Sequence, residues 1–223
     1  MSRGLSERLR AAAAPIWQAQ HDHPFVRAIG DGSVDFGRFR FWVKQDYLFL
    51  IDYARLFALA AARAPDLDAM TAFARLCHET LTTEMDLHRS YAKQFGIEAQ
   101  ELQAERKAPT TQAYTDFLLR TASLGEYAEL VGALLPCMWG FSEVGTELKK
   151  RGVPRQPLCA QWVEMYGSDE FAELASWCRA VLDRLAADLP SSVLDRVEAA
   201  FLTSSRYELA FWEMAQRLEG WPA

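Results

Sequence analysis

Apolar residues recur at intervals of three and four positions along almost the whole chain, which is the spacing of one face of an α-helix. Glycine and proline fall mostly between these blocks, where helices end. No segment shows the sustained alternation of apolar and polar residues that is typical of a strand, and there is no internal repeat. The pattern predicts helices at residues 5–20, 35–63, 67–95, 110–123, 126–150, 156–165, 169–187 and 191–218.

The segments between the predicted helices carry turn signals. "HDHPF" and "GDGS" separate the first two helices, and His21 and His23 are interpreted as a solvated turn and its cap. "RAPDLD" offers Asp66 as an N-cap, and "ELQAERKAPTTQ" is the longest polar stretch. Composition shifts nowhere enough to mark a boundary, so the sequence predicts a single all-α domain, a helical bundle over residues 1–223.

Composition and charge exclude several classes of protein. Half of the 223 residues are apolar, which is enough for a sizeable core without disulfides. The net charge of −6 without a basic stripe argues against a nucleic-acid partner. No apolar run approaches the roughly 20 residues that cross a bilayer, and the N-terminus lacks the apolar centre of a signal peptide. Cys77, Cys137, Cys159 and Cys178 form no CxxC pair, so we expect a reduced, cytoplasmic protein.

The helix predicted at residues 35–63 carries an acidic residue on its apolar face. Asp46 lies four residues after Trp42 and four before Leu50, so the three side chains share that face. Burial of a carboxylate without a partner costs several kcal/mol. Asp46 therefore needs either an ion pair with a buried arginine or a ligand to bind.

The last predicted helix has the same feature. Glu208 lies seven residues after Phe201 and four before Trp212, on the apolar face, and Ser204 lies one turn earlier. An arginine on a neighbouring helix is again the structural alternative. Two different helices thus each direct one carboxylate inward.

Cys137 lies on the apolar face of the helix predicted at residues 126–150, four residues before Phe141. Because the preceding Pro136 cannot donate its backbone hydrogen bond, we expect a kink or a widened turn just before Cys137. A buried cysteine alone is usually an inert filler. Together with Asp46 and Glu208, however, it matches the nucleophile and positioned carboxylates of covalent catalysis.

Aromatic residues accompany these three positions. Flat rings can sandwich a flat heterocycle, and tyrosine hydroxyls can fix its edge, although each ring alone is equally consistent with an ordinary core. The candidates are Tyr47, Phe49, Tyr114, Phe141, Tyr166 and Tyr207.

Two other chemistries find less support. A di-iron site in a helical bundle needs two Glu-x-x-His pairs, but the four histidines all lie in the N-terminal half, at His21, His23, His78 and His88. A cysteine–histidine pair would need an inward histidine beside Cys137, and His88 is the only candidate for it. We therefore expect no metal and no redox cofactor.

Four segments carry a resemblance to a known family. "HPFVRAIGDGSVDFGRFRFWVKQDYLFLIDYARLFALAAARAPD", "LLPCMWGFSEVG", "WVEMYGSDEF" and "SSRYELAFWEMA" resemble, in the same order, motifs of the TenA/thiaminase II family. The resemblance runs from about residue 8 to about residue 218. It implies an all-α fold of the haem-oxygenase-like type without haem, usually assembled as a homotetramer. It also implies hydrolysis of aminopyrimidines in thiamine salvage, and of thiamine itself by some members.

The resemblance also implies roles for individual residues. Asp46 of "QDY" corresponds to the residue that binds the aminopyrimidine, Cys137 of "LPC" to the nucleophile, and Glu208 of "SSRYE" to the acid/base. The pocket aromatics correspond to Tyr47, Phe49, Tyr114, Phe141 and Tyr166. Phe141 departs from the tyrosine that many members have, so the substrate preference stays open.

These observations lead to one main hypothesis and two alternatives. The main hypothesis is conversion of 4-amino-5-aminomethyl-2-methylpyrimidine to the hydroxymethyl pyrimidine, with release of ammonia and with Cys137 as nucleophile. Within enzymes, the alternative is thiamine as the main substrate. Outside enzymes, the alternative is a non-catalytic protein that binds or carries a pyrimidine on the same fold.

Overall fold

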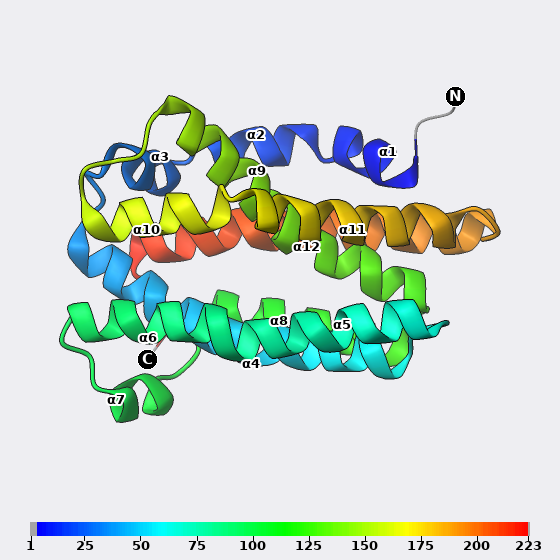
Figure 1. Ribbon diagram of the computed structural model, residues 1–223, viewed down its shortest axis with the longest axis horizontal. Helices are drawn as coiled ribbons and strands as arrows, with labels where there is room; N and C mark the ends of the chain where they lie inside the picture. Colours follow the sequence, from blue (N-terminus) through cyan, green and yellow to red (C-terminus); the bar gives the residue numbers. More distant parts are fainter. Residues whose placement is uncertain (1–3, 223) are drawn as a thin grey trace. The chain divides into compact units, whose positions relative to one another are not determined.

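The computed structural model describes residues 4–222, the side chains at positions 99 and 103 excepted. Within this part of the chain every regular element is a helix (Figure 1), so the predicted all-α class is confirmed. The elements are α1 (Leu5–Ala12), α2 (Ala14–Asp22), α3 (Pro24–Asp31), α4 (Phe36–Ala62), α5 (Leu67–Glu79), the π-helical η1 (Thr80–Glu84), α6 (Met85–Gln94), α7 (Ala99–Ala104), α8 (Pro109–Leu124), α9 (Tyr127–Arg151), α10 (Pro157–Tyr166), α11 (Asp169–Ala186) and α12 (Ser191–Arg217).

Most of the predicted helices are found within a few residues of their expected ends. The helix predicted at residues 5–20 is instead two helices, α1 and α2, which meet at Ala13. Pro15 lies in the first turn of α2, where its missing backbone N–H is tolerated, and it cannot donate to the end of α1. The helix predicted at residues 67–95 is α5, η1 and α6 in succession.

Two short helices, α3 and α7, were not predicted. The start of α3 is capped by His23, whose Nδ1 accepts from the backbone N–H of Phe25 at 3.2 Å, and Gly32 ends the helix with φ 78°. The cap expected at His23 is therefore confirmed, but the expected solvation is wrong. His23 is buried, and its Nε2 lies 3.0 Å from Oε2 of Glu213.

The chain divides into two compact units, each built from two separate stretches of sequence. Unit 1 comprises Met1–Val34 and Ala128–Glu213, and unit 2 comprises Asp35–Tyr127 and Met214–Ala223. That residues 1–223 form a single domain stays a prediction. The two ends of this range, residues 1 and 223, lie outside the described part of the chain.

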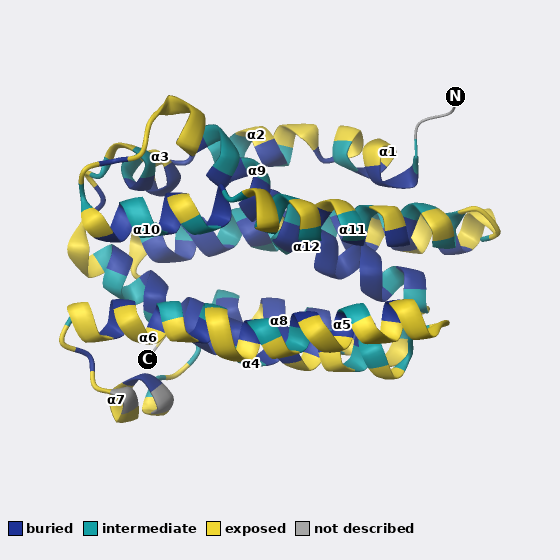
Figure 2. Ribbon diagram, viewed as in Figure 1, coloured by how far each residue is buried: buried dark blue, intermediate teal, exposed yellow. Residues whose placement is uncertain are grey.

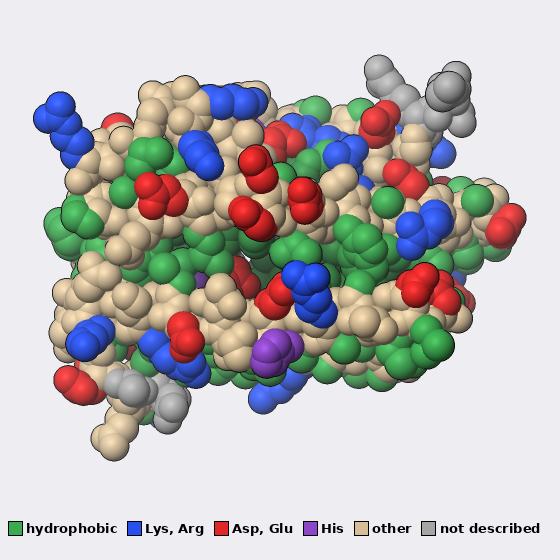
Figure 3. All heavy atoms as spheres, in the orientation of Figure 1, with side chains coloured by type: hydrophobic (Ala, Val, Ile, Leu, Met, Phe, Trp, Pro, Cys, Tyr) green, Lys and Arg blue, Asp and Glu red, His purple; other side chains and the backbone are tan. Residues whose placement is uncertain are grey.

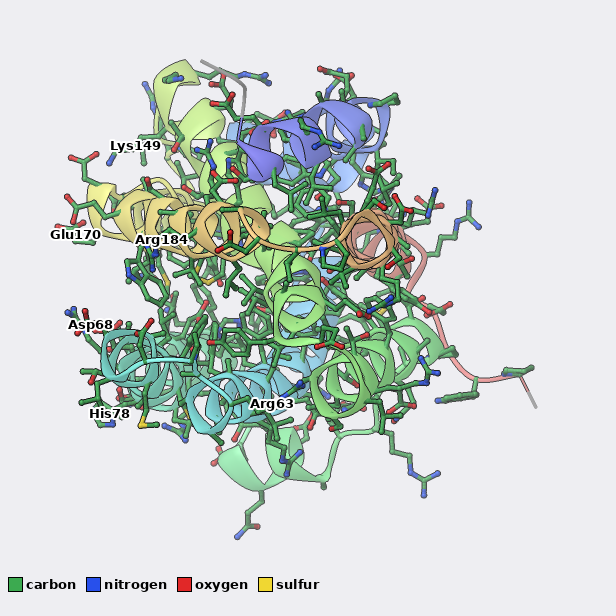
Figure 4. The ribbon with its side chains drawn as sticks, turned by 90° about the vertical axis from the view of Figure 1, so that its right-hand side faces the viewer. Arg63, Asp68, His78, Lys149, Glu170 and Arg184 are labelled. Atoms are coloured by element: carbon green, nitrogen blue, oxygen red, sulfur yellow. The ribbon has the colours of Figure 1, made fainter. Side chains whose placement is uncertain are left out.

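The long helix α4 is the centre of unit 2 and lies against α5, α6 and α8 (Figure 1). Asp35 caps its start by accepting from the backbone N–H of Arg38 at 2.9 Å. Just after its end, Arg63 donates to the backbone carbonyls of Ala122 and Gly125 at the end of α8 (Figure 4). These carbonyls lack partners within their own helix, so Arg63 satisfies them and ties α4 to α8.

The last residues of the chain complete unit 2. Glu219 accepts from the backbone N–H of Thr110, in the first turn of α8, at 2.9 Å. Nε1 of Trp221 donates to the carbonyl of Lys107, in the loop before α8, at 2.9 Å. The C-terminal tail thus anchors the N-terminal end of α8, where backbone N–H groups would otherwise lack acceptors.

In unit 1, α9 has no exposed residue from Ala128 to Leu148 (Figure 2), in agreement with its apolar sequence. Two glycines allow neighbouring helices to approach it closely. A Cβ atom at Gly132 would lie 2.9 Å from Cγ1 of Val197 in α12. A Cβ atom at Gly145 would lie 2.6 Å from the carbonyl oxygen of Tyr166, at the end of α10. Glycine at these two positions therefore sets the helix spacing.

An ion-pair cluster joins α1 and α2 to α9. Glu143 accepts from Nε of Arg10 at 3.1 Å, and its Oε1 lies 3.0 Å from Nε2 of His21. Burial alone would raise the pKa of Glu143, but the hydrogen bonds and charges of His21 and Arg10 outweigh it and lower the pKa to about 2. Glu143 is therefore ionised at neutral pH and stabilises this part of unit 1.

Replacement of Glu143 by glutamine is expected to lower stability at neutral pH by on the order of 1–3 kcal/mol. Since folding lowers the pKa of Glu143 from 4.5 to about 2, its contribution is complete above pH 4.5 and is lost as pH falls towards about 2. Thermal unfolding of both proteins from neutral to acidic pH should show the difference in Tm shrinking over that window. A pH-independent difference in Tm would contradict this. The control is Glu147→Gln on the same helix, where the side chain is partly exposed and pairs with Lys150 at the surface, and it should change Tm little.

None of the helices in the described residues combines the length and apolar character that crossing a bilayer requires. On the face drawn in Figure 3, acidic and basic side chains are interspersed, and no basic stripe is seen.

Candidate functional site

In unit 2, α4 places Asp46 inside the protein. Asp46 is only 4% exposed, and its Oδ2 lies 2.6 Å from Nε2 of His88 in α6. His88 is fully buried and its Nδ1 lies 3.0 Å from the backbone carbonyl oxygen of Glu84. An ion pair between Asp46 and an arginine, the structural alternative to a ligand, is wrong: Asp46 contacts a histidine 42 positions further along the chain.

The π-helical segment η1 lies between α5 and α6 and precedes His88 by one turn. A π-helical turn contains one residue more than an α-helical turn, so it rotates the following residues by about 100° about the helix axis. A straight α-helix over residues 67–94 would therefore place His88 on a different face. The widened turn that was expected beside Cys137 is instead found here, where it orients the residue that contacts Asp46.

The His88–Asp46 contact raises the pKa of the histidine. Burial by itself lowers the pKa of His88, but the hydrogen bond and the charge of Asp46 outweigh it, with a smaller contribution from Glu84. The aromatic rings of Trp42 and Tyr91 flank the imidazole, with ring centroids at 5.8 and 5.9 Å. The pair is thus enclosed by apolar surface, where charge interactions are stronger than in water.

The neighbours of Asp46 on α4 organise the rest of this region. Gln45 holds the loop before α8, since its Nε2 donates to the carbonyl of Arg106 at 3.0 Å and its Oε1 accepts from the N–H of Ala108 at 2.8 Å. Phe49 packs against Tyr114 of α8, with ring centroids 5.1 Å apart. Two of the predicted pocket aromatics of unit 2 are therefore in contact.

In unit 1, α9 carries Cys137, which is half-buried. The helix is α-helical from Tyr127 to Arg151, so the widened turn expected at Pro136 is absent, and a bend of the axis stays a prediction. Burial raises the pKa of the Cys159 thiol to about 11, with help from Asp31, and that of Cys178 to about 12. Neither of these two thiols can form an appreciable amount of thiolate at neutral pH.

Glu208 lies on α12 and is only 2% exposed, so the predicted inward position is confirmed. Ser204 and Ser205 on this helix are also buried, and the hydroxyl of Ser205 accepts from Nε1 of Trp17 at 3.0 Å. Phe141 of α9 packs edge-on against Tyr166 of α10, with ring centroids 5.0 Å apart. Glu208, Cys137 and this aromatic pair all belong to unit 1.

The eight predicted site residues thus form two sets. Unit 2 contains Asp46, Tyr47, Phe49 and Tyr114, and unit 1 contains Cys137, Phe141, Tyr166 and Glu208. Within each set the structure brings two aromatic rings together. Their action on one ligand stays a prediction.

Two further observations concern other parts of the described structure. A cleft of about 260 Å³ between α9 and α11 in unit 1 contains none of the eight predicted residues. Among residues 4–222, no group of three or more His, Cys, Asp and Glu side chains could hold a metal ion.

Comparison with known proteins gives a consistent result. The sequence profile described as the TENA/THI-4/PQQC family matches residues 10–218. A protein of Halalkalibacterium halodurans named "Aminopyrimidine aminohydrolase" is 49% identical over 212 residues, which are 94% of this chain and 94% of the relative.

Solved structures agree with the sequence comparison. The TenA homologue protein from P. horikoshii OT3 superposes with a TM-score of 0.89 at 29% identity, over 96% of this chain and 99% of that chain. A domain of Shewanella denitrificans OS217 described as having a heme oxygenase-like fold gives a TM-score of 0.74 at 15% identity, over 95% and 92% of the two chains. The second likeness concerns the fold alone, and it confirms the predicted haem-oxygenase-like type.

Proposed function

Because the chain belongs to the TENA/THI-4/PQQC family, we propose that it is an aminopyrimidine aminohydrolase of thiamine salvage. The reaction is hydrolysis of 4-amino-5-aminomethyl-2-methylpyrimidine to the hydroxymethyl pyrimidine and ammonia. The observation that carries this proposal is the 49% identity, over 94% of both chains, to a protein named for that activity. The inward positions of Asp46 and Glu208 support it.

Asp46 binds the substrate in this mechanism. Its carboxylate accepts from the exocyclic 4-amino group and from the protonated ring nitrogen beside it, which makes the ring electron-poor. Tyr47, Phe49, Tyr114, Phe141 and Tyr166 enclose the flat ring and exclude water.

Cys137 and Glu208 carry out the covalent steps. Glu208 takes the thiol proton, and the thiolate adds to the unsubstituted ring carbon. The ring electrons then expel the amine from the methylene carbon, and Glu208 returns the proton to the departing ammonia. Water adds to the exocyclic methylene, its proton passes to Glu208, and Cys137 leaves as a thiolate as the aromatic ring is restored. Glu208 then returns the proton to Cys137, so both groups regain their starting states. One water is consumed and one ammonia is released, and the steps balance without an oxidant or reductant.

The test is a product assay with the purified protein on the aminomethylpyrimidine and on thiamine, side by side. The expected result with the aminomethylpyrimidine is release of ammonia together with the hydroxymethyl pyrimidine. Thiamine would give the same pyrimidine with the thiazole as leaving group, so the rate of hydroxymethyl pyrimidine formation ranks the two substrates. Tight binding of the pyrimidine without any product would overturn the proposal in favour of a carrier protein. Phe141 stands where many family members have tyrosine, so Phe141→Tyr is the informative variant for substrate preference.

The assembly and location belong to the same proposal. We expect a homotetramer in the cytoplasm, with a mass about four times the 25.2 kDa of the chain. Light scattering after size-exclusion chromatography measures this mass directly. A monomer or dimer at the concentration of the activity assay would contradict it.

A further inference from the structure

The hydrogen bonds of His88 define where its protons lie. Nδ1 faces the backbone carbonyl of Glu84 at 3.0 Å, and since a carbonyl oxygen can only accept, Nδ1 carries a hydrogen. Nε2 faces Oδ2 of Asp46 at 2.6 Å, a distance that requires one proton between these two atoms. That proton is bonded either to Nε2 of His88 or to Oδ2 of Asp46.

The chemistry of the two groups places this proton on His88. Imidazole is a stronger base than carboxylate, with an ordinary pKa of about 6.5 against about 3.9. Burial opposes a charged imidazole, but the adjacent carboxylate and the Glu84 carbonyl both favour it. The pair is therefore an imidazolium and a carboxylate, with no net charge, enclosed between Trp42 and Tyr91.

An ionised Asp46 can accept hydrogen bonds but cannot donate any. Its Oδ2 receives the hydrogen of His88, and Oδ1 is the second acceptor of the same group. A 4-aminopyrimidine presents an N–H donor at position 4, which matches such an acceptor. A 4-oxopyrimidine presents an oxygen there, so two acceptors would face each other, and a buried contact of that kind is strongly unfavourable.

We propose that His88 is a specificity-determining residue, which keeps Asp46 an acceptor-only carboxylate and so makes the site select 4-amino over 4-oxo pyrimidines. This inference rests on the proposed function, in which Asp46 binds the pyrimidine. His88 acts through Asp46 and is a positioning residue rather than a catalytic one. The π-helical segment η1 is the structural device that brings it to Asp46.

The neighbouring charged residues have other partners. Nη1 of Arg89, the next residue of α6, donates to Asp86 at 2.6 Å, and its pKa is raised by Asp86 and, to a smaller extent, by Tyr47. Lys44, close to Asp46 in sequence, donates to Glu101 and Glu105 at 2.7 and 2.8 Å. His88 is therefore the basic residue in direct contact with Asp46, at 2.6 Å.

The experiment measures equilibrium binding of two ligands that undergo no turnover. These are 4-amino-5-hydroxymethyl-2-methylpyrimidine and its 4-oxo counterpart, titrated calorimetrically into the full-length protein. The wild type should prefer the amino compound by at least about 100-fold. In His88→Leu, Asp46 is buried without its basic partner, a setting that favours a neutral carboxyl. Because a neutral carboxyl can donate to the 4-oxo group, the preference should fall at least about 10-fold.

Other variants separate charge from packing. His88→Gln keeps a hydrogen-bond donor without the charge, so its preference should be intermediate. Asp46→Asn offers an amide donor and should also favour the oxo compound relative to the wild type. The matched control is His78→Gln, the same substitution at an exposed histidine of α5 (Figure 4), which should leave the preference unchanged.

Two results would overturn the inference. The first is equal weakening of both ligands in His88→Leu and His88→Gln, with the ratio unchanged, because that is the effect of lost packing alone. The second is independent of any variant: nitrogen NMR shifts of the wild type at neutral pH that show His88 as neutral imidazole. If the wild type releases ammonia normally, either result rejects the role of His88 and leaves the proposed function intact. If the wild type binds neither pyrimidine and releases no ammonia, the proposed function itself fails and the inference fails with it.

Discussion

Replacement of Cys137 by alanine is expected to lower kcat for ammonia release at least about 1,000-fold, while the pyrimidine still binds. The reason is that the thiolate forms the covalent bond on which both halves of the proposed mechanism depend, whereas ring stacking and the contact with Asp46 do not involve sulfur. Cys137→Ser should be almost as inactive, since a serine hydroxyl without a strong adjacent base is a poor nucleophile. Steady-state assays for ammonia and calorimetric titration with the product separate the two effects.

The matched control is Cys77→Ala, which removes another half-buried cysteine, on α5. Burial raises the pKa of the Cys77 thiol, so it is a poor source of thiolate, and its loss should leave kcat unchanged. Retention of more than about a tenth of the wild-type kcat in Cys137→Ala would reject the covalent route. In that case water would attack the methylene carbon directly, with Glu208 as general base.

The second large effect is expected from Gly145→Ala. The new Cβ atom would lie 2.6 Å from the carbonyl oxygen of Tyr166 and 2.6 Å from the backbone nitrogen of Gly167. These are backbone atoms, so no side-chain rotation relieves the overlap, and α9 must move away from the end of α10. We expect a loss of at least about 2 kcal/mol, or about 5 °C or more in Tm for a chain of this size.

Activity should decrease in Gly145→Ala as well, because Tyr166 follows the displaced backbone and Phe141 packs against it. Gly140→Ala is the control on the same helix, since a Cβ atom there meets its nearest atom, Oε1 of Gln20, at 4.0 Å. That variant should be as stable as the wild type or slightly more so, because alanine favours the helix. Calorimetric melting of the three proteins provides the comparison, and equal Tm values for both variants would show that α9 and α10 are not tightly packed at Gly145.

The hydrophobic period predicts the long helices because each one buries a continuous apolar face. It fails for α3 and α7, which have only two turns, since so few residues cannot establish a period. The signals for α3 were nevertheless present: a histidine cap, Pro24 in the first turn and Gly32 at the end. The same residue types also form turns, so these signals alone do not distinguish a short helix from a turn.

The inward carboxylates could be predicted, but the partner of Asp46 could not. Asp46 and Glu208 stand out because a charged residue interrupts an apolar face. His88 is 42 positions away from Asp46 in the sequence. The π-helical turn that directs His88 inward cannot be predicted from the spacing of apolar residues. The division into two units could not be predicted from the sequence either, because each unit combines stretches that are distant in sequence.

The interleaving of the two units has a consequence for folding during synthesis. Residues up to Val34 leave the ribosome first, yet the rest of unit 1 begins only at Ala128. Synthesis adds about 5–20 residues per second, so the apolar faces of α1, α2 and α3 remain without the rest of unit 1 for on the order of 5–20 s. Most of unit 2 emerges during that interval, but the hydrogen bonds that Glu219 and Trp221 make to it form only after the second stretch of unit 1 has been synthesised. We therefore expect the nascent chain to need a chaperone that shields the amino-terminal helices, and a tag fused to the carboxyl terminus to disturb folding more than one at the amino terminus.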